Sequence, residues 1–441
     1  MIEDSLKKVV ADAVPGTQIK SLQATVSPGL HQIYRATTHD GATIQFSLPL
    51  SPNRRVLRCE YGSIRSEAAI LQWLLWLYKT RPKLGSPKLM SVDFEDKKEL
   101  KNRIRAQAIA RYLPKLLEHG VVGTMQRLQY NVITPCPGRV LSTLDFALTV
   151  ADRRSVDFQI GQMLRCISLL RSPTSRFGTI ESMLPAVPQR SNCEQRRASV
   201  QESNETFARW SDAFGEMLHN AIQDAQSNQI TASYDSIRRF LGRFTHVLDT
   251  VVEPRLVLVD AGLDNNVLVA LQEVENDNSD ASGSGSGAIE VAETSGIINS
   301  SPSIAPGIRV TGIREWAKAI FGDPLLSIML SQAPSEYLLS GFCASLVDTL
   351  DDMDEVSEAL LQNRQHVQIR LNLYRIYHAL NAISVEYIRR DEGSDPRELR
   401  ARRALVEAVR ELDTFDKAET SKRRRRRLEV APSKRARTLS P

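Results

Sequence analysis

The sequence predicts an α+β protein with two lobes, a small β-rich lobe followed by a larger helical lobe. In the first part of the chain, two short β-rich runs flank Asp40-Gly41, a dipeptide that is typical of tight hairpin turns. From about Leu141 onwards, apolar residues recur at the three- and four-residue steps of amphipathic helices. The longest apolar stretches, such as 69–78, fall well short of the roughly 20 residues that cross a bilayer, so no membrane partner is expected.

The N-terminal lobe is expected to occupy residues 21–135, after an N-terminal segment of residues 1–20. Its helix has apolar residues at helical spacing and should end before Pro82, because proline cannot continue a helix. The predicted elements of this lobe are a hairpin over 31–50, a helix from Ile64 to Tyr78, and strands over 87–94 and 128–134.

The C-terminal lobe is expected over residues 136–415 and is mainly helical. It contains a β-rich stretch at 255–271, followed by residues 271–307, whose Ser-Gly repeats and lack of large apolar residues cannot support a core. Residues 271–307 are therefore predicted to be a flexible insertion. Helical patterns cover 155–172, 205–226, 234–252, 337–350, 354–380 and 397–412.

The positive charge of the chain is concentrated in its C-terminal tail. The 441 residues carry 57 Lys and Arg against 52 Asp and Glu, a net charge of +5. Residues 421–441 hold nine of these bases and one acid, so the rest of the chain has 48 bases and 51 acids. A folded body close to neutral argues against a nucleic-acid-binding fold. The segment 416–441 is predicted to be a disordered basic tail.

Two basic clusters in the tail, Lys422–Arg427 and Lys434–Arg437, are typical of nuclear-import signals or nucleic-acid patches. We expect an intracellular protein, because the N-terminus has no apolar leader and the five cysteines are scattered. The hypothesis for the tail is binding to a nuclear import receptor, which would place the protein in the nucleus rather than the cytoplasm. Weak, non-specific nucleic-acid binding and a tail that only maintains solubility are the alternatives.

Two segments far apart in the chain carry the residue types that phosphoryl transfer requires. Asp260, Asn265 and Asn266 lie on a short loop between two apolar strands, and Glu315 follows another predicted strand. Phosphoryl transfer uses one carboxylate to orient the attacking hydroxyl, and an amide with a second carboxylate to hold magnesium against the phosphates. The alternative is that the Asp and Asn residues only form a turn and that Glu315 is a solvated acid at a helix start.

Both segments resemble motifs of the aminoglycoside phosphotransferase family, which shares the protein-kinase-like two-lobed fold with choline kinases. EPRLVLVDAGLDNNVLV is similar to the catalytic loop, EPRLVHxDLxxxNVxV, and VTGIREWAKAIFGDPLL to the metal-binding segment, ITGIIDWExAxxGDPL. The resemblance implies a phosphotransferase that uses ATP and Mg²⁺ and acts on a hydroxyl of a small-molecule substrate. Asp260 would be the catalytic base, and Glu315 would bind magnesium.

Weaker similarities extend over about residues 20–385. Glu67 matches the family's helix glutamate, which positions the cation that grips the phosphates. Ile133, at the start of ITPCPGRVL, lies where the family makes backbone contacts to adenine, and Gly29 lies in the loop that covers the phosphates. Their order along the chain implies the kinase-like fold.

Several positions depart from the family's pattern. Leu258 stands in place of the histidine two residues before the catalytic aspartate, and the metal-binding aspartate is Glu315. The loop after Asp260 has one extra residue, so the metal amide is either Asn265, by spacing from the acid, or Asn266, by register with the strand. We favour Asn266 with a bulge in the loop.

The residues expected at the phosphates also differ. Ser47 occupies the position of the strand lysine or arginine, and Gly29 is the one glycine of a loop that commonly has two. Arg54, Arg55 or Arg58 is an alternative cation from the loop that follows, and His31 is a candidate phosphate contact.

These observations support two hypotheses. The first is ATP-dependent phosphorylation of a small-molecule hydroxyl, with Asp260 as base, Glu67 as a positioning acid, and Asn266 and Glu315 on magnesium. The second is a degenerate kinase fold that binds nucleotide or a protein partner without turnover, because Ser47, Leu258 and Glu315 depart from the family together.

Overall fold

The computed structural model describes residues 2–25, 30–50, 54–79, 102–103, 105–122, 128–187, 205–271, 307–344 and 364–430. Several predicted features lie outside these residues: Gly29, the strand candidate 87–94, most of the insertion 271–307, helical residues in 345–363, and the tail beyond Val430.

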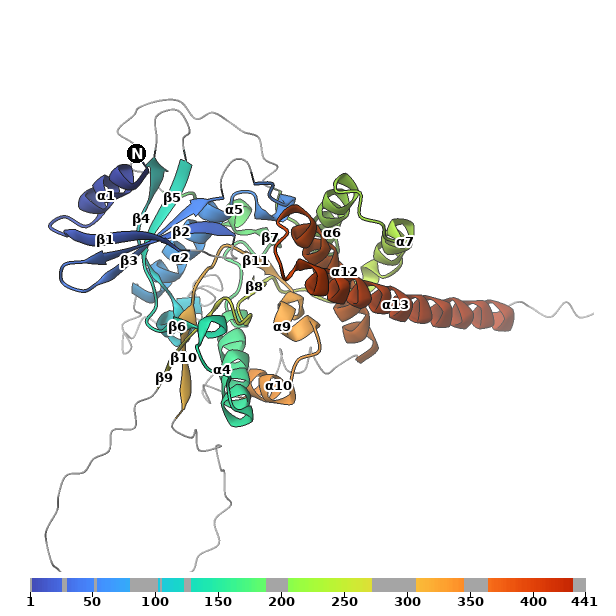
Figure 1. Ribbon diagram of the computed structural model, residues 1–441. Coiled ribbons are helices and arrows are strands. Elements are labelled where there is room, and N and C mark those ends of the chain that lie inside the picture. Colours follow the sequence, from blue (N-terminus) through green and yellow to red (C-terminus); the bar gives the residue numbers. More distant parts are fainter. Residues whose placement is uncertain are drawn as a thin grey trace, which may run out of the picture.

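The N-terminal lobe is built on a five-stranded antiparallel sheet (Figure 1). Its spatial order is β1 (Ile19–Thr25), β2 (His31–Thr38), β3 (Thr43–Pro49), β5 (Leu128–Thr134) and β4 (Lys115–Val122). The hairpin predicted at Asp40-Gly41 joins β2 to β3, and Gly41 adopts a φ of 82° that favours glycine. The sequence did not indicate β4, because its polar residues interrupt the apolar alternation.

Helices cover both faces of this sheet. Leu6 and Val10 of α1 (Ile2–Ala13) pack against the face that carries Phe46 and Val132. The N-terminal segment is thus part of the lobe's core. Because neighbouring strand residues point to opposite faces, Ser47 and Ile133 face the other side, where α2 (Ser63–Lys79) packs.

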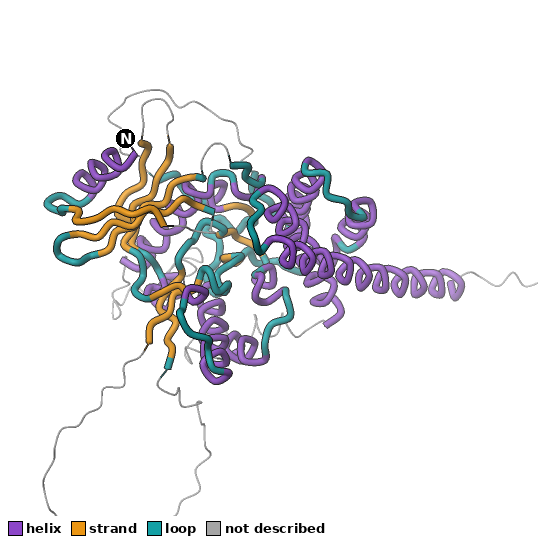
Figure 2. The backbone as a smooth tube through the Cα atoms, viewed as in Figure 1, coloured by secondary structure: helices purple, strands orange, loops and turns teal. Residues whose placement is uncertain are grey.

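The C-terminal lobe is mainly helical, as predicted (Figure 2). Its helices are α4 (Val150–Ser168), α5 (Ile180–Met183), α6 (Trp210–Ser227), α7 (Tyr234–Arg243), α8 (Thr245–Leu248), α9 (Ile328–Ser331), α10 (Glu336–Cys343), α12 (Arg364–Ile388) and α13 (Ser394–Val430). Glycine permits the close crossing of α4 and α10, because a Cβ on Gly161 would lie 2.1 Å from the carbonyl oxygen of Leu338. No helix in the described ranges has both the length and the apolar composition needed to span a membrane.

Two three-stranded sheets lie in this lobe and carry the segments with candidate chemistry. They have the orders β10 (Ile308–Ile313), β9 (Val267–Leu271), β6 (Arg139–Val140), and β7 (Gly178–Thr179), β11 (Ala319–Gly322), β8 (Arg255–Leu258). In the first sheet Leu271 lies opposite Ile308, so the two ends of the insertion meet at the end of the β9–β10 pair. The insertion therefore starts and finishes at one point on the sheet.

The tail prediction needs a correction, because α13 continues as a helix to Val430 instead of becoming disordered at residue 416 (Figure 1). Arg, Lys, Glu and Ala favour helices, and the first part of the tail has partners on the folded body. Arg243 pairs with Asp416 at 2.9 Å, and His246 lies 3.8 Å from Glu419. Composition alone did not indicate these contacts.

A buried histidine of α12 is expected to make stability depend on pH. His378 is buried, and its Nε2 lies 2.7 Å from the carbonyl oxygen of Leu326. Burial lowers its pKa to about 4, whereas the pKa of a histidine in an unfolded chain is about 6.5. Between these values the unfolded chain binds the extra proton, so we expect His378 to reduce stability by about 1.4 kcal/mol per unit as pH falls through this window.

Urea unfolding at several pH values measures this slope. His378→Gln keeps an N–H donor for Leu326 and should remove the contribution, whereas His219→Gln, at an exposed position of α6, should leave the slope unchanged. Parallel curves for His378→Gln and the wild type would contradict the assignment.

Candidate functional site

Asp260, Asn266 and Glu315 meet where β8 and β10 end and β9 begins. Asn266 is buried, and its Nδ2 donates to Glu315 O at 3.1 Å and to Asp260 Oδ1 at 3.3 Å. Its Oδ1 accepts from the Glu315 N–H at 2.8 Å. One amide side chain thus joins two segments that are far apart in the sequence.

The spacing in the sequence left open whether Asn265 or Asn266 lies beside Asp260, and the structure distinguishes the two. Asn265 is exposed, whereas Asn266 points inward to Asp260 and Glu315. The loop closes on itself through backbone bonds, from Leu263 N to Asp260 O at 3.2 Å and from Asn266 N to Leu263 O at 2.8 Å. These turns accommodate the extra residue and place Asn266 at the site.

Each carboxylate of this site has a cation beside it. Lys318 Nζ lies 3.5 Å from Asp260 Oδ2, and Arg314 Nη2 lies 2.5 Å from Glu315 Oε1. Burial raises the pKa of Asp260, and Lys318 partly offsets this effect. Burial also acts to raise the pKa of Glu315, but the charges of His31 and Arg314 outweigh it and the pKa lies below its usual value.

Glu67 connects α2 to the Glu315 segment. It is fully buried, and its Oε1 accepts from the backbone N–H of Trp316 at 3.1 Å. Its Oε2 accepts from Asn131 Nδ2 at 3.0 Å and lies 3.9 Å from His31 Nδ1. Burial raises the pKa of Glu67, although His31 and Asn131 oppose this.

The strand position expected to carry a cation is filled by Ser47, which is fully buried and lies opposite Asn131 on β5. The partners of Glu67 are therefore Asn131, His31 and a backbone N–H. His31 itself is buried, with Nε2 3.0 Å from Ser63 Oγ, so it faces Glu67 and the start of α2.

Ile133 lies inside the N-terminal sheet. Gln45 of β3 and Leu116 of β4 flank it in register, and its side chain is fully buried in the main core. The backbone leaves the sheet only after Thr134, and the carbonyl of Pro137 accepts from Thr311 Oγ1 at 2.5 Å. The residues from Pro135 onwards are thus the first of this segment that lie outside the sheet.

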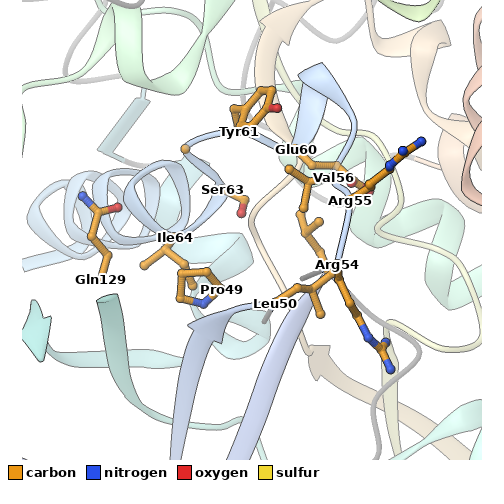
Figure 3. A pocket seen from close by; sticks show the side chains of 12 residues that line it. Pro49, Leu50, Arg54, Arg55, Val56, Glu60, Tyr61, Ser63, Ile64 and Gln129 are labelled. Carbon is orange, nitrogen blue, oxygen red and sulfur yellow. The ribbon is translucent and has the colours of Figure 1, made fainter. Parts of the chain in front are cut away.

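A cavity of about 410 Å³ opens beside the start of α2 (Figure 3). Arg54 and Arg55 form one wall, and in Figure 3 their guanidinium groups point away from Pro49 and Ile64 on the opposite wall. The third arginine proposed from the sequence, Arg58, pairs with Asp224 of α6 at 2.6 Å. In this arrangement none of the three arginines replaces the lysine or arginine that was expected at Ser47, beside Glu67.

The donor set at Asp260, Asn266 and Glu315 does not fit a magnesium ion. Mg²⁺ requires hard oxygen ligands in near-octahedral geometry. Here an oxygen of Glu315 is paired with Arg314, the amide oxygen of Asn266 accepts a backbone N–H, and Lys318 stands beside Asp260. Among the described residues, no group of three or more His, Cys, Asp or Glu side chains is placed to hold a metal.

Sequence reasoning missed Lys318, Arg314 and Asn131. Both cations lie within the segment that resembles the family's metal-binding motif, but their positions depend on strand pairing. Leu258 lies opposite Ala319, which brings Lys318 next to Asp260. Asn131 depends in the same way on the register of β3 against β5.

Comparisons with known proteins return solved structures of small-molecule phosphotransferases. A thermostable mutant of aminoglycoside phosphotransferase APH(4)-Ia, in complex with ADP and hygromycin B, is 13% identical over 92% of this chain and 98% of its own, with a TM-score of 0.45. A candidate fructosamine-3-kinase from Haemophilus somnus 129PT is 11% identical over 91% and 97%, with a TM-score of 0.47. Macrolide 2'-phosphotransferase MphH from Brachybacterium faecium is 11% identical over 88% and 98%, with a TM-score of 0.35. No family model and no curated protein matches the sequence.

Proposed function

We propose that this protein binds ATP and transfers its γ-phosphoryl group to a hydroxyl of a small molecule. The observation that carries the proposal is the Asn266 amide, which joins Asp260 and Glu315 into one hydrogen-bonded unit. A turn that only reversed the chain would not need a buried amide bonded both to an acid of its own loop and to a segment 49 residues away. Phosphoryl transfer depends mainly on such positioning together with charge stabilisation.

The chemistry follows from these residues. The acceptor oxygen forms a bond to the γ-phosphorus, the bond to the bridging oxygen breaks, and ADP leaves with that electron pair. Asp260 takes the proton of the hydroxyl as a general base. Lys318 favours the ionised form of Asp260, and Lys318 and Arg314 supply positive charge for the phosphate oxygens.

The alternative function is nucleotide or partner binding without turnover. Its support is the buried Ser47 in the strand and the ion pairs that already occupy both carboxylates of the site. Both hypotheses place a ligand at the loop that carries Asp260. They differ in whether Asp260 contacts and deprotonates an acceptor hydroxyl.

Thermal shift and ADP formation test the proposal together. If ATP binds the folded chain, its stability should rise by about 2.7 kcal/mol at a hundredfold excess over Kd. ADP formation that depends on an added hydroxyl compound, from a panel of sugars, amino alcohols and aminoglycosides, supports transfer. A thermal shift without transfer to any acceptor supports nucleotide binding without turnover. No shift at millimolar ATP contradicts phosphoryl transfer and leaves partner binding as the function.

Nuclear import through the basic clusters of the tail stays a prediction. A fluorescent fusion lacking residues 421–441 should lose the nuclear enrichment of the intact protein. If the intact and truncated fusions distribute identically, the import hypothesis is wrong. Release of the intact protein from nuclei at low added salt would indicate that nucleic-acid phosphates retain it there.

A further inference from the structure

Arg314 and Lys318 are held in place by the same loop that carries Asp260. The backbone N–H of Arg314 donates to Asn266 O at 2.9 Å, and the carbonyl of Lys318 accepts from Val259 N at 3.2 Å. These bonds flank the loop on both sides. The backbone of both Arg314 and Lys318 is therefore fixed beside the loop that carries Asp260.

The charges of Asp260 and Glu315 are balanced by two neighbouring cations. Asp260 and Glu315 supply two negative charges, and Lys318 and Arg314 supply two positive charges at contact distances of 3.5 and 2.5 Å. A divalent cation is attracted to a site by its uncompensated carboxylates, and here both carboxylates have partners. Binding Mg²⁺ would require the ion to displace Arg314 or to share its carboxylate.

Ser47, at the strand position where a lysine or arginine is expected, also indicates that the phosphates would need another source of positive charge. Ser47 brings no charge to the phosphates, so positive charge must come from another element. The Arg314 side chain is 14% exposed and the Lys318 side chain 36% exposed, so both groups are partly accessible to solvent. Guanidinium and ammonium groups are the protein's usual partners for phosphate oxygens.

We propose that Arg314 and Lys318 take the place of the divalent cation, so that the site binds nucleoside triphosphate phosphates without metal. The inference rests on the nucleotide binding in the proposed function and adds the chemistry that neutralises the phosphates. Arg314 bridges Glu315 to the phosphates as a metal ion would, and Lys318 does the same beside Asp260.

Nucleotide titrations of the full chain test this inference. The dissociation constant of ATP, measured by calorimetry, should agree within about threefold between a buffer with EDTA and one with MgCl₂. Arg314→Ile should weaken binding in EDTA by about tenfold or more and make it depend on Mg²⁺, because Glu315 then has a free oxygen. Lys318→Met should weaken binding in both buffers.

Arg309→Ile is the matched control, since Arg309 is an exposed residue of the same strand and its loss should leave both constants unchanged. Melting curves of each variant verify folding. Tighter wild-type binding in MgCl₂ by about tenfold or more overturns the metal-free site but leaves the proposed function standing. No wild-type binding in either buffer overturns both.

Discussion

Asp260→Asn is expected to lower phosphoryl transfer by about 10²–10⁴-fold while the dissociation constant of ATP changes by less than about threefold. The amide has nearly the shape of the carboxylate but cannot accept the acceptor's proton. The carbonyl oxygen of the new side chain can still accept from Asn266, so the loop should keep its conformation. ADP formation with a productive acceptor gives the rate, and calorimetry gives the affinity.

Asp264→Asn is the control for this prediction. Asp264 lies on the same loop, pairs with Arg153 at 2.8 Å and is 48% exposed. In the described part of the chain, Asp264 makes no hydrogen bond to Asn266 or Glu315. Asp264→Asn should therefore change the rate of phosphoryl transfer by less than about twofold. Turnover that survives in Asp260→Asn would exclude Asp260 as the base.

The general arrangement of the fold was predictable because its signals are local. The Asp40-Gly41 hairpin, the helix from Ile64 and the helical patterns of the second half each depend on residues close together in the sequence. The structure has the predicted small β-rich lobe and larger helical lobe. The strand β4 was not predicted, because Glu118 and His119 interrupt the alternation of apolar and polar residues. In the structure, Glu118 bonds to Tyr130 on the neighbouring strand.

The candidate site was predictable only in part, since its contacts depend on the register between distant strands. The motifs singled out Asp260, Asn266 and Glu315, which the structure brings together through the Asn266 amide, and their roles stay predictions. The pairing of Lys318 with Asp260 follows from β8 lying beside β11, which no local pattern specifies.

The helical end of the chain illustrates the same limit. The charge of residues 416–430 predicts disorder, but charged residues with high helix propensity extend an existing helix when the first turn of the extension is anchored. Asp416 and Glu419 supply such anchors through Arg243 and His246. An ion pair between α13 and α7 cannot be read from the composition of the tail.

Asp323→Ala is expected to lower the free energy of unfolding by about 3–5 kcal/mol. Asp323 Oδ2 accepts from Arg370 Nη1 at 2.7 Å and from the Tyr374 hydroxyl at 2.6 Å, and Oδ1 accepts from Leu325 N at 3.1 Å. The side chains of Asp323 and Arg370 are 4% and 8% exposed. Removing the carboxylate leaves the buried guanidinium of Arg370 without an anion. The Tyr374 hydroxyl, which accepts from Trp210, then has no acceptor for its own proton.

Urea unfolding followed by circular dichroism measures the change. The double variant Asp323→Ala, Arg370→Met should recover a large part of the loss, because it removes the unpaired buried charge as well. Asp145→Ala is the matched control, since its pair with Arg139 is exposed, with side chains 81% and 55% accessible, and should contribute less than about 1 kcal/mol. Equal destabilisation by Asp323→Ala and Asp145→Ala would contradict the buried network, because each variant removes one ion pair but only Asp323 is buried and bonded to further groups.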